Sequence, residues 1–176
     1  MRLHQINLDF LPEHDRLLLR VSTEDQLEVR LWLTRRALRL LWPLLVQMLR
    51  ASPGIASQSN PQARDALVGM QHEQALGRAN FGKPFEEVPR EMPLGAEPIL
   101  VARIRSKRDA DGSPVLTLLP QQGQGIHLAL DETLLHSLCK LLQNAVAKSD
   151  WDIALELPAL QSARAPDDAS MPKTLN

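Results

Sequence analysis

Hydrophobic and polar residues alternate with a period of two in three short stretches at the start of the chain. The alternation covers residues 6–10, 17–21 and 27–33, and the third stretch is the most regular. A period of two predicts β-strands with one buried face. Pro12 and the polar residues 22–25 fall between the stretches and predict turns. The beginning of the chain is therefore predicted to form an antiparallel meander of three strands.

The third stretch leads directly into a leucine-rich helix. Thr34 is a favourable N-cap residue, and leucines follow it at helical spacing at positions Leu38, Leu41, Leu45 and Leu49. Further apolar residues lie outside this stripe, so the helix is predicted to be buried on more than one face. Pro43 lies inside the pattern and is expected to kink or restart the helix.

Large apolar residues are sparse between residues 51 and 97, where Ser, Pro, Gly, Gln and Ala dominate. This composition predicts a long connection. A helix is expected at 61–77 within it, because Asn60 can cap a helix and Pro61 suits the first helical position. The four prolines between residues 82 and 98 indicate an extended segment.

The pattern of residues 1–50 then returns between residues 98 and 150. Strands are expected at 99–105, 115–119 and 126–130, followed by a helix that begins after the N-cap residue Asp131. The last part, 151–176, is expected to add a short strand at 153–157 and then a flexible tail from residue 159.

The two junctions between strand and helix align without a gap at a spacing of 97 residues. VRLWLTRRALRLLWPLLVQML lies over IHLALDETLLHSLCKLLQNAV, and the six identical positions are all leucine. Any strand followed by an amphipathic helix would show part of this likeness. The alignment alone is therefore compatible with a true internal repeat and with a chance likeness. We predict an α+β fold of two repeated βββα units, with an antiparallel sheet packed against leucine-rich helices. Each unit is too small to be stable alone, so the two are expected to share a core.

Composition and charge narrow the classes of protein. Hydrophobic residues make up 44% of the chain and aromatic residues only 3%. The chain has 20 basic and 21 acidic residues, so it lacks the general basic excess that is typical of nucleic-acid-binding proteins. Cys139 is the single cysteine, which excludes an intramolecular disulfide and fits a reducing compartment. The start lacks an apolar signal run, and the apolar stretch 37–49 is too short and too polar to span a bilayer. We therefore expect a cytoplasmic protein without a membrane partner.

No catalytic, metal or nucleotide motif stands out. The five histidines lack metal-ligand spacing, no glycine-rich loop has phosphate-loop spacing, and Cys139 has no His-containing constellation around it. We expect no cofactor and no enzymatic activity, with a small-molecule enzyme that has a scattered active site as a remote alternative.

Four arginines surround the start of the first helix: Arg30, Arg35, Arg36 and Arg39. Helix N-termini attract anions and arginine forms bidentate contacts with phosphate, so these residues are candidates for an anion or nucleic-acid contact. The alternative is an ordinary solvated face, and the matching positions of the second unit are acidic.

Trp32, Trp42 and Val46 are candidates for an interface. Trp32 points to the face opposite Leu31 and Leu33, and Trp42 lies off the main leucine stripe. An exposed patch used for dimerisation and a place in the core are equally compatible with this pattern.

In the order of its elements, the chain resembles the whirly-type single-stranded-nucleic-acid-binding domains. The likeness covers Gln5–Leu49 and Ile99–Lys148, without a specific motif, and the halves of that fold have four strands where three are expected here. The resemblance implies a nucleic-acid-binding sheet surface. In overall style the chain also resembles small conserved bacterial proteins of uncharacterised function.

These observations lead to two functional hypotheses. The first is a non-enzymatic bacterial protein that self-associates, as a dimer, through a surface on the first unit. The second is a single-stranded nucleic-acid-binding module that uses the four arginines.

Overall fold

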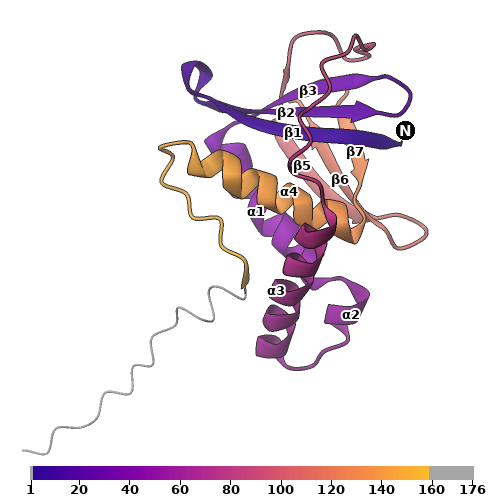
Figure 1. Ribbon diagram of the computed structural model, residues 1–176, viewed down its shortest axis with the longest axis vertical. Helices are drawn as coiled ribbons and strands as arrows, with labels where there is room; N and C mark the ends of the chain where they lie inside the picture. Colours follow the sequence, from indigo (N-terminus) through magenta and orange to yellow (C-terminus); the bar gives the residue numbers. More distant parts are fainter. Residues whose placement is uncertain (1, 159–176) are drawn as a thin grey trace, which may run out of the picture.

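The computed structural model describes residues 2–158, and its first unit is a three-stranded meander followed by a helix (Figure 1). The strands are β1 (Leu3–Leu11), β2 (Arg16–Thr23) and β3 (Glu28–Leu33), and the helix is α1 (Arg35–Arg50). A 3-10 turn, η1 (Pro12–His14), joins β1 to β2. Helix α1 runs through Pro43 without a break, so the helix does not restart at this residue, and the kink expected as the alternative stays a prediction.

The second unit has the same order. Its elements are β4 (Ile99–Leu100), β5 (Arg103–Arg108), β6 (Pro114–Leu119), β7 (Ile126–Ala129) and α4 (Glu132–Ala147). The single strand expected at 99–105 is divided, because the chain passes from one sheet to the other at this point. The amide of Val101 donates to the carbonyl of Trp32 in β3, and the amide of Ala102 donates to the carbonyl of Leu119 in β6.

The strands form a four-stranded sheet of order β1-β2-β3-β4 and a three-stranded sheet of order β5-β6-β7. All neighbours are antiparallel except β3 and β4, which are parallel. Helix α4 packs on β1, α1 packs on β5, and the two helices contact each other. The α+β class and the two strand–strand–strand–helix units are confirmed.

The two long helices occupy matching positions. Helix α4 begins and ends 97 residues after α1, from Arg35 to Glu132 and from Arg50 to Ala147. Both N-caps work in the same way: Thr34 accepts from the amide of Ala37 at 3.1 Å, and Asp131 accepts from the amide of Leu134 at 2.7 Å. Whether the units arose by duplication stays a prediction.

One hydrophobic cluster takes residues from both units. Leu19 and Leu31 of the first sheet, Leu116 and Leu118 of the second, and the inner faces of α1 and α4 all lie in it. The core is therefore shared, as expected for units of this size.

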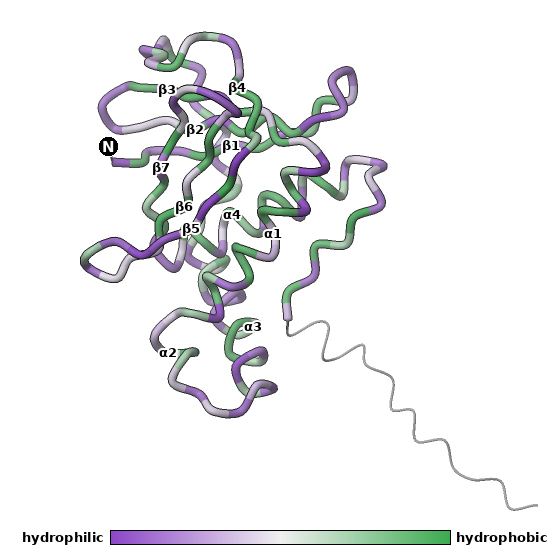
Figure 2. Tube along the Cα trace, turned by 180° about the vertical axis from the view of Figure 1, so that it is seen from behind, coloured by the Kyte–Doolittle hydropathy of each residue, from purple (hydrophilic) through white to green (hydrophobic). Residues whose placement is uncertain are grey.

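The connection carries two helices, α2 (Pro53–Ala56) and α3 (Pro61–Arg78), which lie beside the main body (Figures 1 and 2). Asn60 caps α3 through its side chain. Residues 79–98, called the strap below, cross the outer face of the four-stranded sheet (Figure 1). The strap touches β3 through a backbone bridge between Leu27 and Glu91.

The strand expected at 153–157 is not formed. Residues 151–157 have no strand pairing, although Leu155 and Leu157 are buried. The tail expected from residue 159 lies outside the described residues. Among the helices of residues 2–158, none has the length and apolar character needed to cross a membrane.

Candidate functional site: an open seam between two sheet edges

Carboxylates already engage two of the four candidate arginines. The Nε of Arg30 lies 2.7 Å from Glu28, and Arg35 lies 3.3 Å from Asp15. Arg36 and Arg39 are exposed on α1, with no ion pair to a described carboxylate. The structure therefore leaves only Arg36 and Arg39 of this set available to an anion.

The candidate interface residues lie mostly in the core. Trp42 is 8% exposed, and its Nε1 donates to the carbonyl of Glu156 at 3.3 Å. Val46 is half-buried and packs against the same hydrophobic cluster. Trp32 is half-buried on the outer face, with its ring 4.9 Å from that of His14. These residues do not form a common exposed patch.

Of the edge strands of the two sheets, β1 and β7 border the same cleft. β1 pairs only with β2, and β7 pairs only with β6. Apart from these ladders, no backbone hydrogen bond within residues 2–158 reaches the strands β1 and β7 themselves. An edge strand directs a row of N–H and C=O groups away from its sheet, and such a row readily pairs with another chain.

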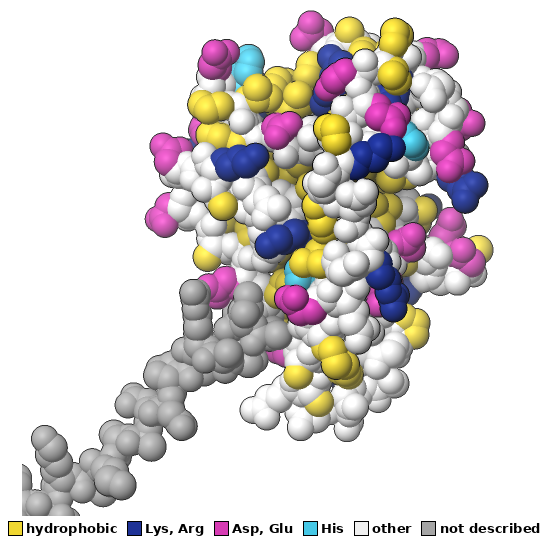
Figure 3. All heavy atoms as spheres, viewed as in Figure 1, with side chains coloured by type: hydrophobic (Ala, Val, Ile, Leu, Met, Phe, Trp, Pro, Cys, Tyr) yellow, Lys and Arg dark blue, Asp and Glu magenta, His cyan; other side chains and the backbone are white. Residues whose placement is uncertain are grey.

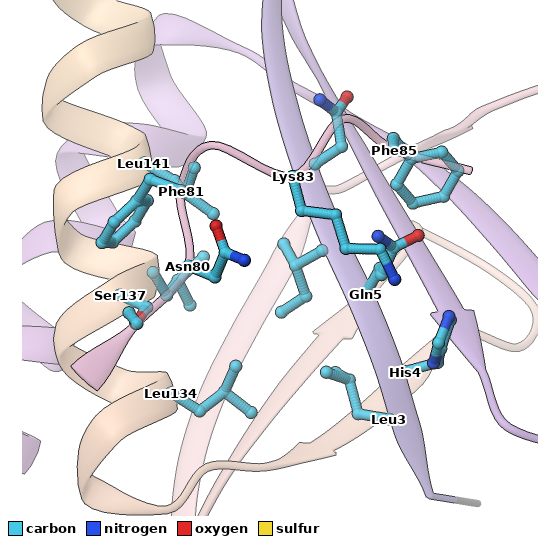
Figure 4. Close-up of a pocket in the computed structure, with 14 residues that line it drawn as sticks. Leu3, His4, Gln5, Asn80, Phe81, Lys83, Phe85, Leu134, Ser137 and Leu141 are labelled. Carbon is cyan, nitrogen blue, oxygen red and sulfur yellow. The ribbon is translucent and has the colours of Figure 1, made fainter. Parts of the chain in front are cut away.

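Both edges border a cleft, called the seam below, which has two adjacent parts. One part has a volume of about 370 Å³ and lies between β1, α4 and the start of the strap (Figure 4). The other has about 530 Å³ and lies between the start of β1, β7 and the start of α4. Leu3, Leu134 and Ser137 line both parts, so the parts lie next to each other.

The floor of the seam is formed by apolar residues of a helix. Leu134, Leu138 and Leu141 project from one face of α4, at the helical spacing of four and three residues. Leu134 and Leu141 are only half-buried, so their side chains remain available for contact. Helices are more precise supports for a binding site than loops.

The start of the strap forms a roof over the seam. Asn80, Phe81, Lys83 and Phe85 line it from this side, and Figure 4 shows Phe81 beside Leu141 and Asn80 between Leu141 and Leu134. Phe81 is 42% exposed, so its ring is accessible at the roof of the seam.

Gln5 and Glu86 fix the roof to β1. The side chain of Gln5 donates to the carbonyl of Pro84 at 3.3 Å and accepts from the amide of Glu86 at 3.0 Å. Glu86 also lies 2.6 Å from Lys83 and 3.2 Å from His4. Hydrogen bonds from Lys83, and secondarily from His4, lower the pKa of Glu86. The rim of the seam therefore carries paired charges, and Figure 3 shows charges of both signs interspersed on this face.

A buried ion cluster holds the next part of the strap on the outer sheet face. Glu28 is 2% exposed and is paired with Arg20, Arg30 and Arg90. The ring of Phe85 lies 4.1 Å from the guanidinium of Arg20 and 5.1 Å from that of Arg90. This end of the four-stranded sheet is therefore covered by the strap and is closed to other ligands.

Burial alone would raise the pKa of Glu28, but the hydrogen bonds from Arg20 and Arg30 outweigh it and the net pKa is lowered. The carboxylate is therefore charged at neutral pH. A buried charge with several charge-assisted partners is costly to disrupt, although Arg20 and Arg90 also lie near Glu87 and Glu86.

Among residues 2–158, no three His, Cys, Asp or Glu side chains are grouped so that they could hold a metal ion. Cys139 is fully buried, and burial raises its pKa to about 12. This thiol is a core residue, as its pattern in the sequence suggested.

Comparison with protein-family models, with curated proteins and with solved structures gives no match to this chain. The fold and the seam alone therefore define its class: an α+β domain with two unpaired sheet edges across an apolar cleft.

Proposed function

We propose that the protein is a non-catalytic binding module that takes up an extended peptide segment of a partner in the seam. One observation carries the proposal: the edge strands β1 and β7 of the two sheets both border the seam, whose floor is formed by apolar residues of helix α4. Backbone pairing at an exposed edge provides affinity in strand-addition complexes, and pockets for alternate side chains provide specificity.

The direction of the inserted segment follows from the topology. β1 and β3 run in the same sense, β4 is parallel to β3 and continues into β5, and β7 runs in the same sense as β5. A segment that is antiparallel to β1 is therefore antiparallel to β7 as well. Antiparallel pairing is slightly more stable per residue than parallel pairing, so this direction is favoured at both edges.

The expected partner is a short segment with alternating apolar residues. β7 has 4 residues and β1 has 9, which sets the length that can pair at both edges. Alternate side chains of the segment would face the leucines of α4, and the others would face solvent. The rim offers no excess of either charge, so the segment is expected to be largely uncharged.

Self-association, expected from the sequence, is one form of this binding, in which the segment comes from a second copy. Sedimentation velocity over a range of concentrations separates the two cases. A monomer that binds peptides supports a heterologous partner, and a dimer that peptides dissociate supports a second copy as the natural occupant.

The test uses peptides of about seven residues displayed on phage, followed by fluorescence anisotropy with the selected peptide. Leu134→Lys and Leu141→Lys place a charge on the floor and should weaken binding at least about tenfold, because the ammonium must be desolvated. Leu40→Lys is the matched control, since Leu40 is 51% exposed on α1 outside the seam. Selected peptides that bind both floor variants normally would contradict the proposal.

A second candidate function is binding of single-stranded nucleic acid, and strand β5 favours it. Ile104 packs against the core, so Arg103, Arg105 and Lys107 lie on the opposite face, and all three are exposed. None of them forms an ion pair with a described carboxylate, whereas Arg20, Arg30 and Arg35 do. Figure 2 shows β5 as a hydrophilic strand at the near side of the molecule.

Titration of a labelled oligothymidine at increasing salt tests this alternative. Three phosphate contacts predict that the logarithm of the affinity falls against the logarithm of salt with a slope of about −2. Arg105→Gln should reduce the slope and Arg36→Gln should not. Absence of binding at low salt would eliminate this function and leave the three cations as protection of an edge strand against aggregation.

A further inference from the structure

Two buried histidines form a direct contact between α3 and α4. The Nδ1 atoms of His72 and His136 lie 3.1 Å apart, and the ring centroids are separated by 5.2 Å. His72 is 6% exposed and His136 is 1% exposed. At this distance one Nδ1 must carry a proton and donate it to the other, so the contact exists only while at least one ring is neutral.

In the sequence, this contact comes shortly before the residues that form the roof of the seam. Helix α3 ends at Arg78, and the chain continues at once into Asn80, Phe81 and Lys83, which line the seam. The other polar tie of α3 to the body joins Asp65 to Arg50 of α1, near the opposite end of the helix. A shift of the His72 end of α3 would therefore move the roof.

We propose that the His72–His136 pair is an acid-operated latch: protonation of the pair releases the end of α3 from α4 and withdraws the roof from the seam. The inference rests on the proposed peptide-binding function for its consequence. The release of α3 itself can be measured without any peptide.

Protons can reach the pair from solvent. His136 lines a cavity of about 240 Å³ together with the exposed residues Arg108, Asp111 and Glu132. Other charged groups near the pair are Glu73 on α3 and Lys140 on α4, which act in opposite directions on His72. Helix α2 and the end of α1 contribute Met48, Leu49, Ser52 and Pro53 to the cavity, without a charge. The surroundings therefore hold no carboxylate bonded to either ring.

The direction of the effect follows from linkage. Burial lowers the pKa of His72 below its ordinary 6.5, and burial together with the charge of His72 lowers the pKa of His136 to about 4. Because the latched state binds protons more weakly than the released state, acid favours release. The latch holds fully above about pH 6.5 and loosens as the pH falls toward 4.

Once both rings are charged, two N–H donors face each other and neither has an acceptor. The contact then changes from a hydrogen bond to a repulsion between two buried cations. His4 lies apart from this pair, at the rim of the seam, 3.2 Å from Glu86.

Amide hydrogen exchange of α3 tests the latch on the full chain without peptide. After correction for intrinsic rates, the opening of the last two turns of α3 should increase at least about tenfold between neutral pH and the acid side of the transition, while β6 stays protected. In the His72→Asn variant, the asparagine keeps a polar atom near the Nδ1 position but has no titratable group. This variant should therefore lose the pH-dependent increase in the opening of α3. His14→Asn, at an exposed ring, should leave it intact.

A wild-type α3 that stays equally protected at both pH values would overturn the latch. So would a pH response that persists in His72→Asn. If His72→Asn does not fold, His136→Asn provides the same comparison, and the titration of the two imidazole rings by NMR gives a readout without any variant. Peptide binding that ignores pH although α3 opens would leave the latch in place and contradict its link to the seam.

Discussion

At the scale of single residues, Glu28 is the group whose loss should cost the most. Glu28→Ala would leave Arg20, Arg30 and Arg90 around an empty site and is expected to destabilise the fold by about 3–5 kcal/mol, measured by urea denaturation. Glu24→Ala is the matched control, because Glu24 pairs with Arg2 at the surface and should cost less than about 1 kcal/mol. Equal losses for the two variants would contradict the role of the buried cluster.

The same carboxylate predicts how stability depends on acid. The pKa of Glu28 is lowered below its ordinary 4.5 in the folded state, so the contribution of the cluster is complete above that pH. The contribution is lost as the pH falls through the lower folded value. The free energy of unfolding of the wild type should therefore decline below about pH 4.5. The free energy of unfolding of the Glu28→Gln variant should decline less steeply over the same pH range.

Residue patterns alone could not decide where the tryptophans lie. Trp42 sits off the leucine stripe of α1, and its indole is covered by residues near Glu156, which are distant in the sequence. The arginine cluster shows the same limit, because Asp15, the partner of Arg35, comes from the turn between β1 and β2. Side chains that are buried or paired by remote segments carry no local signal.

At the scale of elements, the N-caps are the most predictable feature. Thr34 and Asp131 were identified from residue type and position, and both accept the predicted hydrogen bond from an amide three residues later. Thr34→Ala should destabilise the protein by about 0.5–2 kcal/mol, measured by thermal and urea unfolding. Thr34→Ser should retain most of the stability, and a loss as large as that of the alanine variant would refute the capping role.

The failed strand at 153–157 shows where a period of two misleads. Leu155 and Leu157 are buried, so the alternation was real. The backbone of this segment is bonded by side chains and not by a strand: Trp42 donates to the carbonyl of Glu156, and Gln143 donates to that of Leu155. Periodicity reports which side chains face the core, and it does not report what the backbone bonds to.

At the scale of the whole molecule, the shared core predicts a single cooperative transition. All three tryptophans lie outside the segment from β5 to α4, which contains Cys139. Tryptophan fluorescence and the reactivity of Cys139 should therefore report coincident urea transitions. Two separate transitions would mean that the units are stable on their own.

The seam lay beyond the reach of sequence reasoning. The sequence indicated the strands and the leucines of α4, but an open edge depends on which strands become neighbours. Two features decide which strands become neighbours: the parallel pairing of β3 with β4, and the division of the strand at residues 101–102. Both depend on hydrogen bonds between segments that are distant in the sequence. The floor residues Leu134 and Leu141 looked like ordinary core positions in the sequence.

The most direct test of the central claim measures amide exchange at single-residue resolution, by NMR, before and after a selected peptide is added. Strand insertion predicts new protection at alternate residues of both β1 and β7, where amides now point into the seam, and no change in β5. Protection confined to α1, or to β1 without β7, would contradict a seam that closes around an added strand.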